Sequence, residues 1–238
     1  MRNDEMFRGQ LPRIYELSDL IATPAPAGAY FHNLNASLAA IPQKLKQYRD
    51  IEAELQVLDY DAWACLKAKV EPDLKRKDAL RAWEQAFNTL NEAKGYKYLV
   101  SAGYSDIRFI PVSGQSTPDL EAFEGSRRIL CEVKTINRSD QQRETFARNE
   151  VFDVVDQLDE GFFTKLECSL NNAAKQMRAY CSEADTRRIA YVIINLDDIL
   201  HEYADRYRVQ LESFLVSKKP SDIEVVWDIK PPFYTSQL

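Results

Sequence analysis

The chain has 238 residues, enough for one large domain or for a core domain with a helical extension. Hydrophobic residues make up 45% and charged residues 29%, a globular balance that excludes a low-complexity chain. The net charge of −6 counts against a protein that holds nucleic acid on a uniformly basic surface, although a local basic patch stays open.

Hydropathy and cysteine usage point away from membranes and zinc sites. The longest apolar run, residues 189–196, has only the length of a buried strand. The first ten residues lack the apolar stretch of a secretory signal. The four cysteines form no C-x-x-C pair and the chain has two histidines, so we expect a cytoplasmic protein with reduced thiols.

In the N-terminal third, the spacing of apolar residues predicts helices after a proline-rich start. Residues 1–28 read as an irregular arm with one helical turn near 14–21. Apolar residues at helical spacing predict two helices over 34–48 and 51–66, and Pro72 interrupts this pattern.

We place a domain boundary near Asp78. Residues 1–77 form the predicted N-terminal arm and helical region, and residues 78–238 form the second domain. The basic run over 67–81 contains charges of both signs, so we interpret it as a solvated helix face rather than a phosphate-binding surface.

The second domain opens with a helix that carries an acidic residue at the margin of its apolar stripe. Asp78 is a plausible N-cap, and Glu84 is the acid best placed to be half buried. Gly95 is expected to end this helix. Strands are then predicted over 96–102 and 107–112.

The most informative stretch, residues 117–137, predicts a hairpin that turns at Glu124-Gly125-Ser126. Because side chains alternate along a strand, Glu132 and Lys134 should share one face, with Cys131 and Val133 on the other. Pairing of the two strands would bring Asp119 near Glu132.

Two carboxylates beside a lysine at a buried sheet are costly unless a charge neutralises them. Mg²⁺ (or Mn²⁺) meets this need, because it prefers oxygen ligands and retains water. The alternative is a solvated amphipathic hairpin that carries Asp119, Glu132 and Lys134 by chance.

A long polar connection over 138–161 follows, which is either a lid over the site or a decoration. The next helix, over 162–182, carries Gln176 and Tyr180 on one face. The remaining predicted elements are a central strand, a helix and a last strand, over 188–196, 199–216 and 223–229.

Four features resemble the PD-(D/E)XK nucleases, the restriction-endonuclease-like superfamily. Pro118-Asp119 followed by Glu132-Val133-Lys134 is similar to the family signature. The run from Glu84 to Gly95-Tyr96 resembles the first helix of that family, and Gln176 with Tyr180 resembles its Q-x-x-x-Y element. The four features occur in the family's order over about half of the chain.

The resemblance implies an α/β fold with an αβββαβ core, in which helices flank a central mixed sheet, plus the N-terminal helical extension. It implies Mg²⁺-dependent hydrolysis of phosphodiester bonds in nucleic acid, with DNA favoured over RNA. The implied metal ligands are the side chains of Asp119, Glu132 and Glu84 and the carbonyl of Val133.

In the same reading, Lys134 would hold the attacking water and Gln176 would position the network around the metal. Cutting both strands of a duplex would favour a homodimer. The alternative function is a catalytically silent nuclease-fold protein that binds DNA or a protein partner. The acidic net charge favours this alternative, whereas the intact set of Asp119, Glu132 and Lys134 favours the nuclease.

Overall fold

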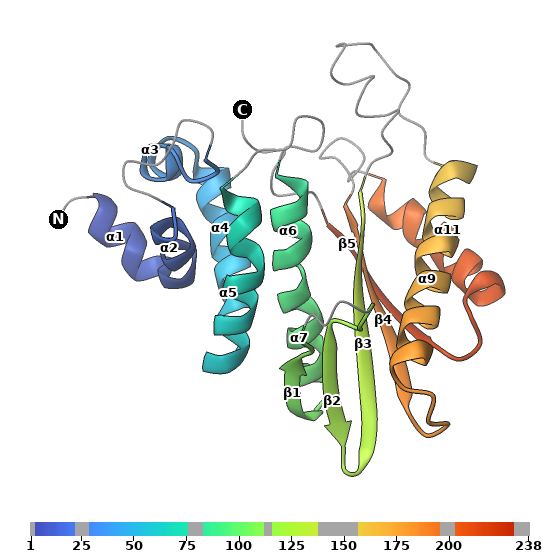
Figure 1. Ribbon diagram of the computed structural model, residues 1–238. Coiled ribbons are helices and arrows are strands. Elements are labelled where there is room, and N and C mark those ends of the chain that lie inside the picture. The colour runs from blue at the N-terminus through green and yellow to red at the C-terminus, as the bar shows by residue number, and fades with distance from the viewer. Residues whose placement is uncertain are drawn as a thin grey trace. The chain divides into compact units, whose positions relative to one another are not determined.

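A computed structural model of the chain describes residues 3–21, 29–75, 83–111, 116–137, 157–195 and 203–230 (Figure 1). The chain forms two compact units, Met1–Tyr98 with Phe233–Leu238, and Leu99–Pro232. The boundary predicted at Asp78 lies outside the described ranges. Within those ranges, none of the helices combines the length and the hydropathy needed to cross a bilayer.

Helices make up the described part of the N-terminal unit. They are α1 (Asn3–Gln10), α2 (Pro12–Asp19), α3 (Leu34–Ala40), α4 (Pro42–Leu55), α5 (Tyr60–Leu74), α6 (Glu84–Leu90) and α7 (Glu92–Ser101), whose last turn falls in the second unit. The irregular arm predicted over 1–28 is therefore wrong for its described part, except for the helical turn expected near 14–21, which belongs to α2. Pro12 takes the first position of α2, where a proline costs no hydrogen bond, and the buried Glu52 carboxylate accepts the amides of Arg13 and Ile14 at 3.1 and 3.0 Å.

The predicted helices over 34–48 and 51–66 are present, with their breaks shifted. Pro42 starts a new helix, and Pro72 lies inside the last turn of α5 without ending it. The described lysines of the basic run form ion pairs of 2.8, 2.7 and 2.6 Å, namely Lys67 with Glu16, Lys69 with Glu92, and Lys75 with Glu71. These pairs agree with the interpretation of a solvated helix face.

An open mixed sheet forms the centre of the second unit. Its strands are β1 (Ser105–Phe109), β2 (Leu120–Glu124), β3 (Arg127–Ile136), β4 (Arg187–Asn195) and β5 (Glu224–Lys230), in that spatial order (Figure 1). Neighbours from β1 to β3 pair antiparallel, and β3, β4 and β5 run parallel. The chain is thus an α/β protein with helices flanking a five-stranded sheet.

Two helices cover one face of this sheet, α9 (Glu160–Tyr180) and α11 (Ala204–Lys218). Their apolar sides share one core with strand residues, as Leu170 and Leu211 do with Leu130 and Val192. The continuous apolar run of β4 is confirmed as a central strand, because Ile189, Ala190, Val192 and Ile193 are all fully buried.

The strand predicted over 96–102 is wrong, because this segment belongs to α7. Ala93, Tyr96 and Leu99 are buried at helical spacing, whereas Val100 is exposed. Gly95, expected to end the preceding helix, lies inside α7. The second predicted strand, over 107–112, is present as β1, although Val112 lies outside the described residues.

The central hairpin is confirmed, with its turn where the sequence places it. Glu124 pairs with Arg127, so Gly125 and Ser126 form a two-residue connection. Gly125 has φ +62°, a backbone conformation that residues with a Cβ atom adopt at a cost.

Gly125→Ala should therefore lower the free energy of unfolding by about 1 kcal/mol, the cost of a left-handed alanine. A Cβ atom at this position would meet no atom within 4 Å, so no steric term adds to this cost. Urea unfolding of the variant checks the value, with the neighbouring exposed Ser126→Ala as the control. Equal unfolding midpoints for the two variants would contradict this view of the turn.

Candidate functional site

The hairpin places Asp119 beside Glu132. The last paired residues of β2 and β3 are Leu120 and Cys131, and one further step in that register sets Asp119 opposite Glu132. The amide of Asp119 donates to Oε2 of Glu132 at 3.2 Å, and the amide of Val133 donates to Oδ2 of Asp119 at 2.8 Å. The two acidic residues are thus locked together by reciprocal backbone contacts.

Lys134 and Gln176 complete the surroundings of Glu132. The Nζ of Lys134 donates to Oε1 of Glu132. The Nε2 of Gln176 donates to Oε2 of Glu132 at 3.0 Å and also to the carbonyl of Thr117. The structure therefore brings together four residues that the sequence analysis selected, Asp119, Glu132, Lys134 and Gln176.

Helix α9, which packs against the sheet, supplies Gln176. The helix starts where the Asp159 side chain accepts the amide of Phe162 at 2.6 Å. Its buried residues Ala173, Ala174 and Met177 fix the rotation of the helix against the sheet. Gln176 lies at the margin of this buried stripe, from which its amide reaches the hairpin.

Burial makes Glu132 an unusual carboxyl group, because its residue is only 2% exposed. Desolvation and the nearby Asp119 charge raise its pKa to about 7, against the lowering effect of Lys134. The neighbouring Cys131 lies on the opposite side of β3, as the alternation predicts, and burial raises the pKa of its thiol well above the usual value.

The donors at this site fit a hydrated hard cation. Asp119 and Glu132 offer carboxylate oxygens, which Mg²⁺ and Mn²⁺ accept, and water can supply the remaining ligands. Within the described ranges, no group of three or more His, Cys, Asp or Glu side chains is placed to hold a metal ion together. A metal held here would therefore keep much of its water shell.

Two predicted ligands stay predictions. Glu84 belongs to the N-terminal unit, where it is buried in the first turn of α6. Val133 contacts Asp119 through its amide, and the role predicted for its carbonyl concerns a bound metal. The connection predicted over 138–161 as a lid or a decoration lies outside the described residues up to position 156, and its predicted end is wrong, because Glu160 and Gly161 belong to α9.

The sequence analysis missed a second charged group next to this site. Glu121 is 3% exposed and forms ion pairs with Arg108 and Arg128. Alternation along β2 and β3 could have signalled Glu121 and Arg128, since they stand two and four residues from Asp119 and Glu132. The contact of Arg108 with Glu121 depends on how β1 pairs with β2, and this pairing carries no local sequence signal.

Comparison with known proteins adds no relative: no family model, curated protein or solved structure matches the chain. The assignment of a function therefore depends on the geometry of the site itself.

Glu132→Gln should flatten the pH dependence of stability in EDTA. A carboxyl group whose pKa is raised in the folded state stabilises the fold at low pH, and this stability is lost as pH rises through about 7. Between pH 4.5 and 8, the wild type should therefore lose up to about 3 kcal/mol that the variant retains. Urea unfolding at both pH values measures the difference.

Glu124→Gln provides the control, because Glu124 is exposed on the same hairpin. Its stability should follow pH in parallel with the wild type. If the Glu132→Gln curve also runs parallel to the wild type, Glu132 does not carry a raised pKa.

Proposed function

We propose that this protein is a metal-dependent nuclease that hydrolyses phosphodiester bonds, with DNA the favoured substrate. The observation that carries the proposal is the buried Glu132 carboxylate, which contacts the backbone of Asp119, the ammonium of Lys134 and the amide of Gln176. A metal ion bound between the two acids would activate a water molecule and stabilise negative charge on the phosphate.

The order of elements supports the proposal. Among the described residues from α7 onward, the elements follow the order α7, β1, β2, β3, α9, β4, which agrees with the αβββαβ order expected of a PD-(D/E)XK core. The resemblance in the sequence is carried by Asp119, which immediately precedes β2, and by Glu132 and Lys134 on the adjacent strand β3. An accidental hairpin would have no reason to gather Gln176 from α9 at the same carboxylate.

Each residue then has a chemical role. Asp119 and Glu132 would hold the cation, and Gln176 would keep the Glu132 carboxylate oriented. Lys134 would bind the attacking water and offset charge on the phosphate. In the reaction, the water oxygen bonds to phosphorus, the bond to the leaving sugar oxygen breaks, and that oxygen takes up a proton.

The metal also resolves the electrostatic cost of the site. Glu132 is desolvated and lies near a second acid, an arrangement that favours its protonated form near neutral pH. A divalent cation favours the ionised form of both acids, so metal affinity should rise with pH. A silent binding protein would gain nothing from keeping these two acids together.

The decisive experiment is a cleavage screen on circular plasmid, linear DNA and RNA with Mg²⁺, Mn²⁺ or EDTA. We expect cleavage with the metals and none in EDTA. Asp119→Ala and Lys134→Ala should each lower the rate at least about 100-fold, as expected for loss of an electrostatic group in a buried site. Lys175→Ala is the charge-matched control, since Lys175 is exposed on α9 beside Gln176.

Circular dichroism should show that the variants remain folded. Cleavage that persists in EDTA, or that survives both substitutions, would refute the assignment. Binding of DNA without cleavage under every metal condition would point to the silent nuclease-fold alternative.

A further inference from the structure

Next to the proposed metal site, two arginines share one buried carboxylate. Glu121 lies in β2 and is 3% exposed. Its Oε2 accepts from Nε of Arg108 at 2.9 Å, and its Oε1 lies 3.1 Å from Nε of Arg128. Arg108 and Arg128 are called the arginine pair, and together with Glu121 they form a group drawn from β1, β2 and β3.

The register places this group on the same side of the sheet as Glu132. Glu121 is opposite both Arg108 on β1 and Leu130 on β3. Arg128, Leu130 and Glu132 alternate with Cys131 along β3 and therefore share one face. Two residues along a strand span about 7 Å, which separates Glu121 from Asp119, and the four residues from Arg128 to Glu132 span about 13 Å.

The charges of the group do not cancel. One carboxylate faces two guanidinium groups, which leaves a local positive excess in a chain whose net charge is −6. The Arg108 side chain is 64% exposed and that of Arg128 is 35% exposed. In the described part of the chain, the Nη1 amino group of Arg108 makes no hydrogen bond, so it can donate to a ligand.

A purely structural role explains this group less well. A buried carboxylate needs compensation, but a single well-placed arginine can supply it with two hydrogen bonds. Here a second arginine is held on the same carboxylate, and Nη1 of Arg128 also donates to the Cys181 sulfur at 3.5 Å. Arg108 keeps a donor that faces solvent. A fixed, planar guanidinium suits the geometry of a phosphate, and the shared carboxylate limits the freedom of both side chains.

We propose that Arg108 and Arg128, oriented by Glu121, bind a phosphate of the nucleic-acid backbone that neighbours the cleaved one. This inference rests on the proposed nuclease function and assigns the substrate's path to the side of the site formed by β1 and β2. It also accounts for how a chain with an acidic net charge can hold a polyanion.

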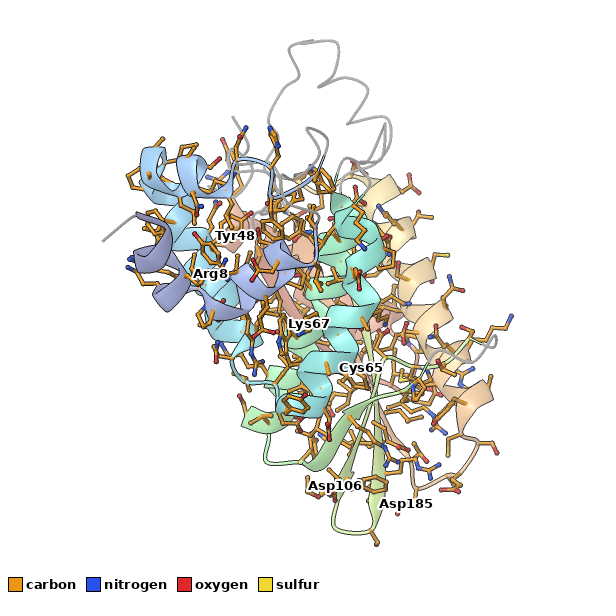
Figure 2. The ribbon with its side chains drawn as sticks, turned by 60° about the vertical axis from the view of Figure 1, so that its left-hand side comes forward. Arg8, Tyr48, Cys65, Lys67, Asp106 and Asp185 are labelled. Atoms are coloured by element: carbon orange, nitrogen blue, oxygen red, sulfur yellow. The ribbon has the colours of Figure 1, made fainter. Side chains whose placement is uncertain are left out.

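The matched control is the residue next to Arg128. Arg127 alternates to the opposite face of β3, and its Nε lies 3.3 Å from the Asp185 carboxylate. Figure 2 shows Asp185 at the end of the sheet where the hairpin turns. Arg127→Gln removes the same charge as Arg108→Gln or Arg128→Gln while leaving the arginine pair intact.

Binding is measured first, by fluorescence anisotropy of a labelled DNA oligonucleotide with Ca²⁺ in place of Mg²⁺, at several salt concentrations. Arg108→Gln and Arg128→Gln should each weaken binding several-fold and lower the slope of log affinity against log salt by about 1. Arg127→Gln should leave the slope within error of the wild type. Thermal unfolding checks that each variant is folded, and the exposed Arg108 still tests the proposal if Arg128→Gln unfolds.

Once cleavage by the wild type has mapped the cleaved bond, affinity is measured on modified DNA. A neutral methylphosphonate replaces one neighbouring phosphate at a time. For one position, the wild type should lose affinity while Arg108→Gln is unaffected by the change. If wild type cleaves DNA but the three arginine variants bind alike, the phosphate site is refuted and the nuclease stands. If wild type neither cleaves nor binds, the proposed function itself is refuted.

Discussion

The structure of the second unit depends on how one buried carboxylate is compensated. Glu132 sits in the middle of β3, almost without solvent, and faces the acidic Asp119 from the neighbouring strand. An isolated charge there would be costly, so the fold surrounds it with the Lys134 ammonium and the Gln176 amide. These contacts tie β2, β3 and α9 to one point. Desolvation and the Asp119 charge outweigh this compensation and raise the pKa of the Glu132 carboxyl to about 7.

The neighbouring carboxylate, Glu121, is compensated in a different way. Two arginines from β1 and β3 pair with it, so the local charge is positive rather than balanced. Two carboxylates on one face of one sheet therefore create two different surroundings. The first suits a cation and the second suits an anion, and a phosphodiester beside a metal ion requires both. The acidic net charge of the whole chain says little about this site, because it averages over all faces of the protein.

Most of the architecture could be predicted from local patterns. The turn at Gly125, the alternation around Glu132, the helix that carries Gln176 and the buried β4 all follow from spacing and residue type. The strand prediction over 96–102 was wrong because the aromatic and branched residues of this segment favour a strand locally. Its burial follows a helical period, and Ala93, Tyr96 and Leu99 pack as one stripe. The prediction of an irregular start over 1–28 was wrong because Pro12 begins α2 rather than breaking a helix.

By itself, the sequence determined which residues could share a face, since alternation along a strand and periodicity along a helix are properties of the local backbone. It therefore set Glu132 with Lys134 and predicted that Asp119 would approach them across a short turn. Only the tertiary structure decided that Gln176 reaches the same carboxylate and that Arg108 joins Glu121. These contacts join residues that lie 44 and 13 positions apart. Their formation depends on strand register and on the packing of α9, which no short stretch of sequence encodes.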